Sequence, residues 1–414
     1  MQAGRTAFYF SLLAFGMAVA TAPQVKWVHL SSARGELPNP AGSNQQTGVL
    51  AAKLDKQRAA GFVISYRVHA PALVWMRKTP AGWDRYVIEN EFIRLEAGGA
   101  AQDIDGDGDL DIVFGEDSSG NRLFWWENPY PKYDPNVSWT RRIIKSGGAN
   151  QHHDQVFADF QGTGKAQLVY WNQRAKSLFI AGIPNNPANT EPWPAQAIFS
   201  GQAGDQVAQA AAYAEGLDAF DVDGDGKVDL LAGNHWFKHQ GGSRFLPVRV
   251  GEIGGRIRAG RFRKGVKTAQ VVIAPGDGNG PLRIYEAAGD PVKPESWSGR
   301  DLLDRDMVHG HTLEAADVDG DGNLDIFAAE MAKWTNTPAE ADHPKATAWI
   351  LYGDGKGAFR KTVLVEGHGW HEGRLADFDG DGDIDVLNKP YTWTAPRIDL
   401  WLNNGTGKTG GRRR

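Results

Sequence analysis

Four segments of this 414-residue chain repeat the pattern Asp-x-Asp-Gly-Asp-Gly-x-x-Asp. The two glycines allow a tight turn, so the carboxylates at the first, third, fifth and ninth positions converge on one point. Hard oxygen ligands in that number suit Ca²⁺, and a bound cation relieves the repulsion among the acids, so we predict about four structural calcium ions. Their expected ligands are Asp103, Asp105, Asp107, Asp109, Asp111, Asp221, Asp223, Asp225, Asp229, Asp317, Asp319, Asp321, Asp325, Asp377, Asp379, Asp381, Asp383 and Asp385.

A second set of residues stands six positions before the first residue of a repeat. In three copies, one of them degenerate, this position holds His153, His311 or His371, and in a fourth copy it holds Glu215. Imidazole nitrogens with a carboxylate are ligands that Zn²⁺ or Mn²⁺ accepts. The pattern therefore predicts one divalent transition metal, and a polar channel that holds only water is the alternative.

The segments around these positions add residues capable of acid–base chemistry on a sugar. A neutral histidine takes a proton beside a carbonyl or carboxylate near neutral pH, and a tyrosine or lysine protonates the leaving oxygen. Arginine or a cation stabilises the enolate between these steps, which together make a β-elimination. The expected catalytic residues are His311, His371, His235, Tyr391, Lys389, Arg374 and Glu330, and the expected sugar contacts are Trp236, Trp334, Trp370, Trp393 and His69.

The elements that must position these residues form seven repeated units. Three degenerate copies join the four acidic segments, so that units begin at residues 53, 103, 159, 221, 261, 317 and 377. Each unit contains four short β-rich runs separated by turn residues, which is typical of a propeller blade. We predict an all-β, seven-bladed β-propeller of four-stranded blades.

The two ends of the repeat region complement each other. The seventh unit ends at Leu402 without a fourth strand, and residues 26–30 near the N-terminus have the missing pattern. An N-terminal strand that completes the last blade would close the ring and hide its edges. An open solenoid of the same repeats is the alternative. In a propeller the acidic turns lie on one face, and the histidine positions lie on the other.

Composition excludes several classes of protein. The absence of cysteine excludes a disulfide scaffold, a zinc ribbon and thiol catalysis. The formal net charge is −5 and no basic stripe precedes Arg412–Arg414, which argues against nucleic-acid binding. Residues 1–22 have the charge, apolar run and small-residue end of an export signal, with a short membrane anchor as the alternative.

The chain then divides into the signal (1–22), one propeller (23–405) and a disordered tail (406–414). No comparable apolar run follows the signal, so we expect no membrane span after its removal and a secreted or periplasmic protein. The oligomeric state stays open.

The units resemble the FG-GAP/VCBS repeat family, which includes the blades of the integrin α-subunit propeller. The segments 309–314, 329–331 and 370–372, together with 388–391, further resemble the propeller domain of aldos-2-ulose dehydratase and its bacterial relatives. This resemblance implies a metal-assisted dehydratase or lyase acting on keto-sugars at the channel mouth.

The predicted function is therefore a secreted carbohydrate-active lyase or dehydratase that acts on a keto-sugar or a uronide, with a polymeric substrate left open. A non-catalytic calcium-binding propeller that binds glycans or proteins is the alternative. A purely structural envelope module is a third interpretation.

Overall fold

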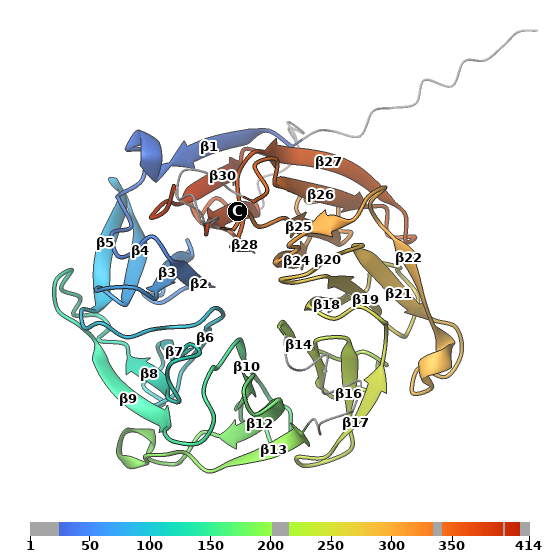
Figure 1. The fold of residues 1–414 in the computed structure, drawn as a ribbon, viewed down its shortest axis with the longest axis horizontal. Helices are drawn as coiled ribbons and strands as arrows, with labels where there is room; N and C mark the ends of the chain where they lie inside the picture. The colour runs from blue at the N-terminus through green and yellow to red at the C-terminus, as the bar shows by residue number, and fades with distance from the viewer. Residues whose placement is uncertain (1–24, 201–214, 334–341, 392–393, 406–414) are drawn as a thin grey trace, which may run out of the picture.

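The computed structural model describes residues 25–200, 215–333, 342–391 and 394–405, and in this part of the chain seven four-stranded antiparallel sheets form a closed ring (Figure 1). This confirms the predicted propeller. Blade 1 is β2 (Gln46–Ala52), β3 (Gly61–Tyr66), β4 (Leu73–Thr79) and β5 (Gly82–Glu89). Blade 2 is β6 (Ala100–Gln102), β7 (Asp111–Gly115), β8 (Leu123–Glu127) and β9 (Thr140–Lys145). Blade 3 is β10 (Gln155–Ala158), β11 (Gln167–Asn172), β12 (Ser177–Gly182) and β13 (Ala195–Ser200).

The remaining blades follow in chain order. Blade 4 is β14 (Leu217–Phe220), β15 (Asp229–Ala232), β16 (His235–His239) and β17 (Phe245–Arg249). Blade 5 is β18 (Arg256–Gly260), β19 (Gln270–Ala274), β21 (Arg283–Ala287) and β22 (Trp297–Asp301). Blade 6 is β24 (Thr312–Ala316), β25 (Asp325–Ala329), β26 (Thr347–Gly353) and β27 (Phe359–Glu366). Blade 7 is β28 (Glu372–Ala376), β29 (Asp385–Lys389), β30 (Asp399–Asn403) and β1 (Trp27–Ser31).

Minor elements complete the described residues. A two-stranded sheet joins β20 (Asn279–Gly280) to β23 (Met307–Val308), and 3₁₀ turns cover Ser32–Arg34, Pro187–Asn189 and Pro294–Ser296. None of the helical segments in this part of the chain has the length and apolar character needed to cross a bilayer. The predicted signal and tail lie outside the described residues.

The hydrophobic core lies between blades rather than within them. Each of the seven interfaces between adjacent blades has its own buried apolar cluster, such as Trp75 with Trp126 between blades 1 and 2. The second strand of a blade is buried on both faces by its neighbours, which explains the continuous apolar runs of β7 and β19. The innermost strands contact one another around the channel, from β2 through β28 and back to β2.

The N-terminal strand completes the last blade, as the sequence predicts. β1 pairs antiparallel with β30, from Trp27 opposite Asn403 to Ser31 opposite Asp399. The His29 ring stacks on Trp401 with 4.4 Å between centroids, and its Nε2 lies 2.9 Å from Asp399 Oδ1. Side chains as well as the ladder therefore hold β1 to β30.

Replacing His29 by Ala should weaken this closure. The variant loses the ring stack, the hydrogen bond to Asp399 and a long contact to Arg34. The stack and the Asp399 bond together contribute about 1–2 kcal/mol to stability. Urea unfolding of His29→Ala should show that decrease. The control is His69→Ala, which removes an exposed loop histidine with a single long contact to the Ala70 carbonyl. Equal stability of the two variants would contradict a role for His29 in closure.

Candidate functional site

The histidine loops of the innermost strands meet at one cavity of about 480 Å³. His153, Glu215, His311 and His371 each immediately precede or stand two residues before an innermost strand, on the face opposite the acidic turns. All four line the cavity. Its other lining residues are Arg67, Glu96, Gln151, Gln173, Arg174, Lys176, Asp277, Met331, Lys333 and Tyr391.

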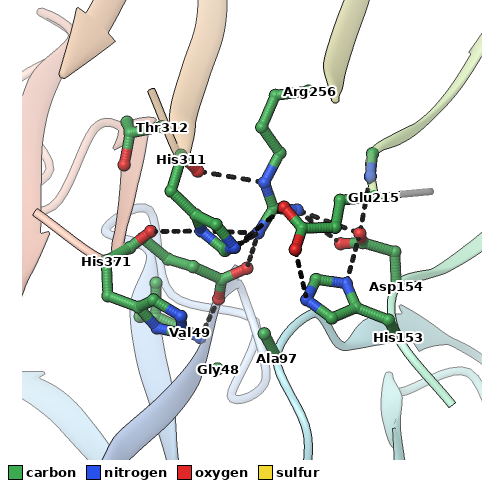
Figure 2. A network of polar contacts seen from close by, with 12 residues as sticks. Gly48, Val49, Ala97, His153, Asp154, Glu215, Arg256, His311, Thr312 and His371 are labelled. Atoms are coloured by element: carbon green, nitrogen blue, oxygen red, sulfur yellow. Dashed lines mark hydrogen bonds and ion pairs between the residues drawn. The ribbon is translucent and has the colours of Figure 1, made fainter. Parts of the chain in front are cut away.

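Three of the four predicted ligands converge. Ligand atoms of His153, Glu215 and His311 all lie within 4.8 Å of one another, and all three residues are buried (Figure 2). His311 Nε2 lies 3.0 Å from Glu215 Oε2, and His153 Nε2 lies 3.9 Å from Glu215 Oε1. His371 does not join them, because its ring stacks on that of His311 with 4.4 Å between centroids.

His311 faces Glu215 with its Nε2 atom. His311 Nδ1 lies 2.7 Å from the backbone oxygen of His371, which can only accept, and 2.9 Å from Arg256 Nη2, which can only donate. Arg256 Nη2 also donates to Glu372 Oε1. His311 Nε2 lies 3.0 Å from Glu215 Oε2, a buried oxygen for which the described residues supply no hydrogen bond. A proton or a metal cation between these two atoms would satisfy both of them.

The Nδ1 atom of His153 lies against the carboxylate of Asp154. His153 Nδ1 lies 2.7 Å from Asp154 Oδ2, and Arg256 Nη1 donates to both oxygens of Asp154 at 2.9 Å (Figure 2). Burial opposes a charge on His153, but Asp154 outweighs it and raises the pKa of His153 to about 9. A histidine whose second nitrogen bonds a carboxylate is the usual arrangement around protein-bound Zn²⁺. A metal at Nε2 would take the place of the proton there.

His371 is supported differently, by a buried lysine. Lys389 Nζ contacts His371 Nδ1 at 2.5 Å and the backbone oxygens of Gln46 and Thr47 at 2.8 and 2.5 Å. Burial lowers the pKa of Lys389 well below its ordinary value, and burial together with Lys389 does the same to His371. Tyr391 lies beside His371, with 4.8 Å between ring centroids. Lys389 itself is fully buried and does not line the cavity.

Below the cavity, alternating charges fill the channel. Arg256 links Asp154 to Glu372, Arg374 contacts Glu372 and Glu314, and Arg258 also pairs with Glu314. Arg374, predicted to be catalytic, belongs to this network rather than to the cavity lining. The network holds the innermost strands of blades 5, 6 and 7 to the blade 3 loop that carries Asp154.

Several predicted residues lie elsewhere. Glu330 is fully buried, bonded to Arg305, His343 and two backbone N–H groups, and does not line the cavity. His235 is buried at the start of β16 and does not line the cavity. His69 is exposed but outside the cavity.

The predicted aromatic contacts also need correction. Trp236 and Trp370 have no exposed surface and pack in the cores between blades, so the prediction that they stack on a sugar is wrong. Trp236 and Trp370 both lie close to the expected loops, but their rings point into the cores between blades. Trp334 and Trp393 lie outside the described residues.

Sequence reasoning missed the charged rim of the cavity. Arg67, Glu96, Arg174, Lys176, Asp277 and Lys333 come from loops of five blades. Counting from the repeats locates residues at the ends of strands. It does not locate residues at the tips of loops, because the loops differ in length between blades. Arg67 directly follows β3, and Arg174 and Lys176 follow Asn172, the last residue of β11, so strand ends are the signal that could have found these three.

The acidic turns lie at the opposite end of the blades. The ninth aspartate of each turn accepts two backbone N–H bonds, as Asp111 does from Ile104 at 2.9 Å and Asn128 at 2.8 Å. Burial raises the pKa of Asp111, Asp325 and Asp385 to about 7. Asp109 Oδ1 and Asp319 Oδ1 are buried without a hydrogen-bond partner. These carboxylates fit a hard cation.

The turn of blade 4 differs from the other three. Lys238 Nζ contacts Asp223 and lies 3.0 Å from Asp225 Oδ2. Among the ion pairs of the described residues, no other acidic turn has a side-chain cation in this place. Lys238 therefore competes with any calcium ion at this turn.

One family model matches two stretches of the chain. Residues 103–170 and 317–387 match the model of the FG-GAP-like repeat. No curated protein sequence matches the chain. Similar solved structures include the V. cholerae biofilm matrix protein Bap1, at 9% identity, TM-score 0.48, and coverage of 87% of this chain and 88% of that chain. The exotype rhamnogalacturonan lyase YesX has 12% identity and TM-score 0.47, and a Bacillus licheniformis rhamnogalacturonan lyase has 14% and 0.47. Both cover 92% of this chain and 76% of their own.

Replacing Arg256 by Met should destabilise the protein strongly. The buried carboxylates of Asp154 and Glu372 would lose their shared cation, and breaking a buried ion pair costs about 3–5 kcal/mol. Denaturant unfolding of Arg256→Met should show this loss, and Lys132→Met, at an exposed site, should show none. A small effect at Arg256 would mean that the network contributes little to the fold.

Proposed function

We propose that this FG-GAP-repeat propeller is an exported, metal-assisted carbon–oxygen lyase that catalyses β-elimination on a keto-sugar or uronide in the 480 Å³ cavity. The observation that carries the proposal is the convergence of His153, Glu215 and His311 at the channel mouth. Two imidazole nitrogens and a carboxylate oxygen form a donor set that suits Zn²⁺ or Mn²⁺. The partnerless Glu215 Oε2 supports the presence of a cation between these groups.

A divalent ion bound there would act as a Lewis acid on the sugar carbonyl or carboxylate and stabilise the enolate. Three protein ligands would leave such an ion able to accept an oxygen from the cavity. Asp154 and the His371 backbone oxygen hold the two imidazoles in the orientation that directs Nε2 inward. The chain thus supplies a preorganised electrophilic site.

His371 is the proposed base. We propose that both His371 and Lys389 are neutral when the base acts, and burial lowers the pKa of each in the direction that this requires. A neutral Lys389 amine has two hydrogens for the Gln46 and Thr47 oxygens and one lone pair for His371 Nδ1–H. His371 Nε2 then keeps its lone pair and can accept the proton next to the carbonyl or carboxylate.

Tyr391 is the proposed acid. Burial raises its pKa, so the hydroxyl keeps its proton at neutral pH and can donate it to the departing oxygen. It lines the cavity beside His371, and the two rings are 4.8 Å apart. Base and acid therefore stand on the same side of the cavity, next to the proposed metal ligands.

Replacing His311 or Glu215 by Ala should abolish the reaction. Each variant loses a ligand of the electrophilic site, and we expect a fall in rate of about a hundredfold or more. The measurement is the ultraviolet absorbance of the unsaturated product from keto-sugars and from uronides, together with elemental analysis of the purified proteins. The matched control is His239→Ala, a histidine at the acidic-turn end of blade 4.

The results of these assays distinguish a lyase from a non-catalytic binding module. Loss of product together with loss of one zinc or manganese ion supports the proposal. Full activity in both variants would exclude this site. Saturable glycan binding by the unaltered protein, with no product and no transition metal, would instead make the propeller a non-catalytic binding module.

We further propose that calcium ions at the acidic turns stabilise the ring in place of disulfides. The turns of blades 2, 6 and 7 are the best candidates for calcium sites, because in blade 4 the Lys238 ammonium already pairs with carboxylates of the turn. A site occupied at a hundredfold excess over its Kd adds about 2.7 kcal/mol.

Chelation should therefore lower the Tm. Burial raises the pKa of Asp111, Asp325 and Asp385 to about 7, so without metal these acids destabilise the folded state as the pH rises from about 4 to 7. The Tm gained on adding calcium should therefore be larger at pH 8 than at pH 5, and calorimetry measures it. Lys238→Met should increase the calcium dependence. An unchanged Tm under all these conditions would exclude structural calcium.

A further inference from the structure

Two cations at the rim of the cavity have no partner. Arg174 and Lys176 both line it, and within the described part of the chain neither side chain makes a hydrogen bond or ion pair. The other two cations of the lining are neutralised. Arg67 pairs with Glu96 and with Asp117 at 3.3 Å, and Lys333 Nζ lies 3.4 Å from Asp277 Oδ1.

The turn that carries these cations is fixed to the loop of His153. It connects β11 to β12 and spans residues 173–176. Asn172 is buried, and its Nδ2 donates to the Ala149 oxygen at 3.0 Å, while its Oδ1 accepts from Ala175 N at 3.2 Å. The Gln173 N–H donates to the Gln151 oxygen at 2.9 Å. Arg174 and Lys176 are thus held at a set position relative to His153.

Lys176 occupies a backbone conformation that does not favour lysine. Its φ is 53°, in the left-handed region where glycine or asparagine is the ordinary choice. A residue with a Cβ pays about 1–2 kcal/mol for this conformation. Gly or Asn here would relieve the turn but remove a positive charge from the cavity.

The charges left over in the cavity are therefore positive. The carboxylates of Glu96 and Asp277 already face Arg67 and Lys333, and Glu215 belongs to the proposed metal site. Arg174 and Lys176 stand two residues apart on one turn, and both line the cavity. A carboxylate bound there would gain charge-assisted hydrogen bonds from both side chains.

We infer that Arg174 and Lys176 bind a carboxylate of the substrate, so that the cavity selects acidic saccharides, in which uronate units supply the carboxylate, over neutral sugars. This inference rests on the proposed function for its assignment of the cavity as the substrate site. It chooses the uronide over the neutral keto-sugar. The guanidinium accepts the planar carboxylate in a forked geometry, and the lysine adds a flexible point charge.

The test compares two ligands that differ only in charge. A hexuronate trisaccharide and its carboxyl-reduced neutral counterpart are titrated into the full-length protein by calorimetry. The acidic ligand should bind at least about tenfold more tightly, which corresponds to one charge-assisted hydrogen bond, and added salt should reduce the difference. The double variant Arg174→Gln/Lys176→Gln should lose the preference while binding of the neutral ligand is unchanged.

Two control variants accompany it. Arg174→Lys keeps the charge and should retain most of the preference. Lys165→Gln removes an exposed charge from the opposite end of the same blade and should change nothing. Equal binding of the two ligands, or a preference that survives in the double variant, would overturn the inference.

Turnover assays separate this inference from the proposed function. Elimination on a neutral keto-sugar, at equal rates in the unaltered protein and the double variant, would overturn the inference and leave the lyase standing. Selective binding of the acidic ligand without any product would support carboxylate recognition and overturn the lyase. Failure of both ligands to bind would overturn both.

Discussion

The packing of each blade against both neighbours is the constraint on which the rest of the structure depends. The apolar clusters lie between blades, so no blade has a complete core by itself. The ring is finished only when blade 7 packs on blade 1, and blade 7 is finished only when β1 pairs with β30. Closure brings the innermost strands into contact around the axis and so gathers loops that are far apart in the chain (Figure 1).

The clusters of polar residues at the two ends of this ring are assembled in different ways. At one end, carboxylates gather within single turns, each of which is complete in a nine-residue segment. At the other end, each functional group comes from a different blade, and His153, Glu215 and His311 meet across the channel. Between the two ends, Arg256 and the carboxylates around it fill the channel with buried charge. The cavity consequently has a polar floor, and access to it is from the histidine face.

Particular residues show which features of the structure can be predicted from spacing along the sequence. The repeat frame predicts seven blades, the closing strand and the equivalence of His153, His311 and His371, because register within a strand is strictly periodic. It places Trp236 and Trp370 near the correct loops, yet both rings are buried between blades. Glu330 is turned away from the cavity for a related reason: groups of Arg305, Val308, His343 and Thr347 bind its carboxylate. Backbone position follows from register, whereas side-chain direction follows from what packs nearby.

The sequence by itself determined the propeller, its closure and the acidic turns, because each depends on local periodicity or on ligands that lie within one short segment. Only the tertiary structure decided that three of the four predicted ligands converge, that His371 stacks beside them on a buried Lys389, and that Lys238 occupies one acidic turn. It also decided that Arg174 and Lys176 line the rim of the cavity without a hydrogen bond or ion pair to any other described residue. These relations join different strands and blades, and their distances are set by the closed ring rather than by spacing along the chain.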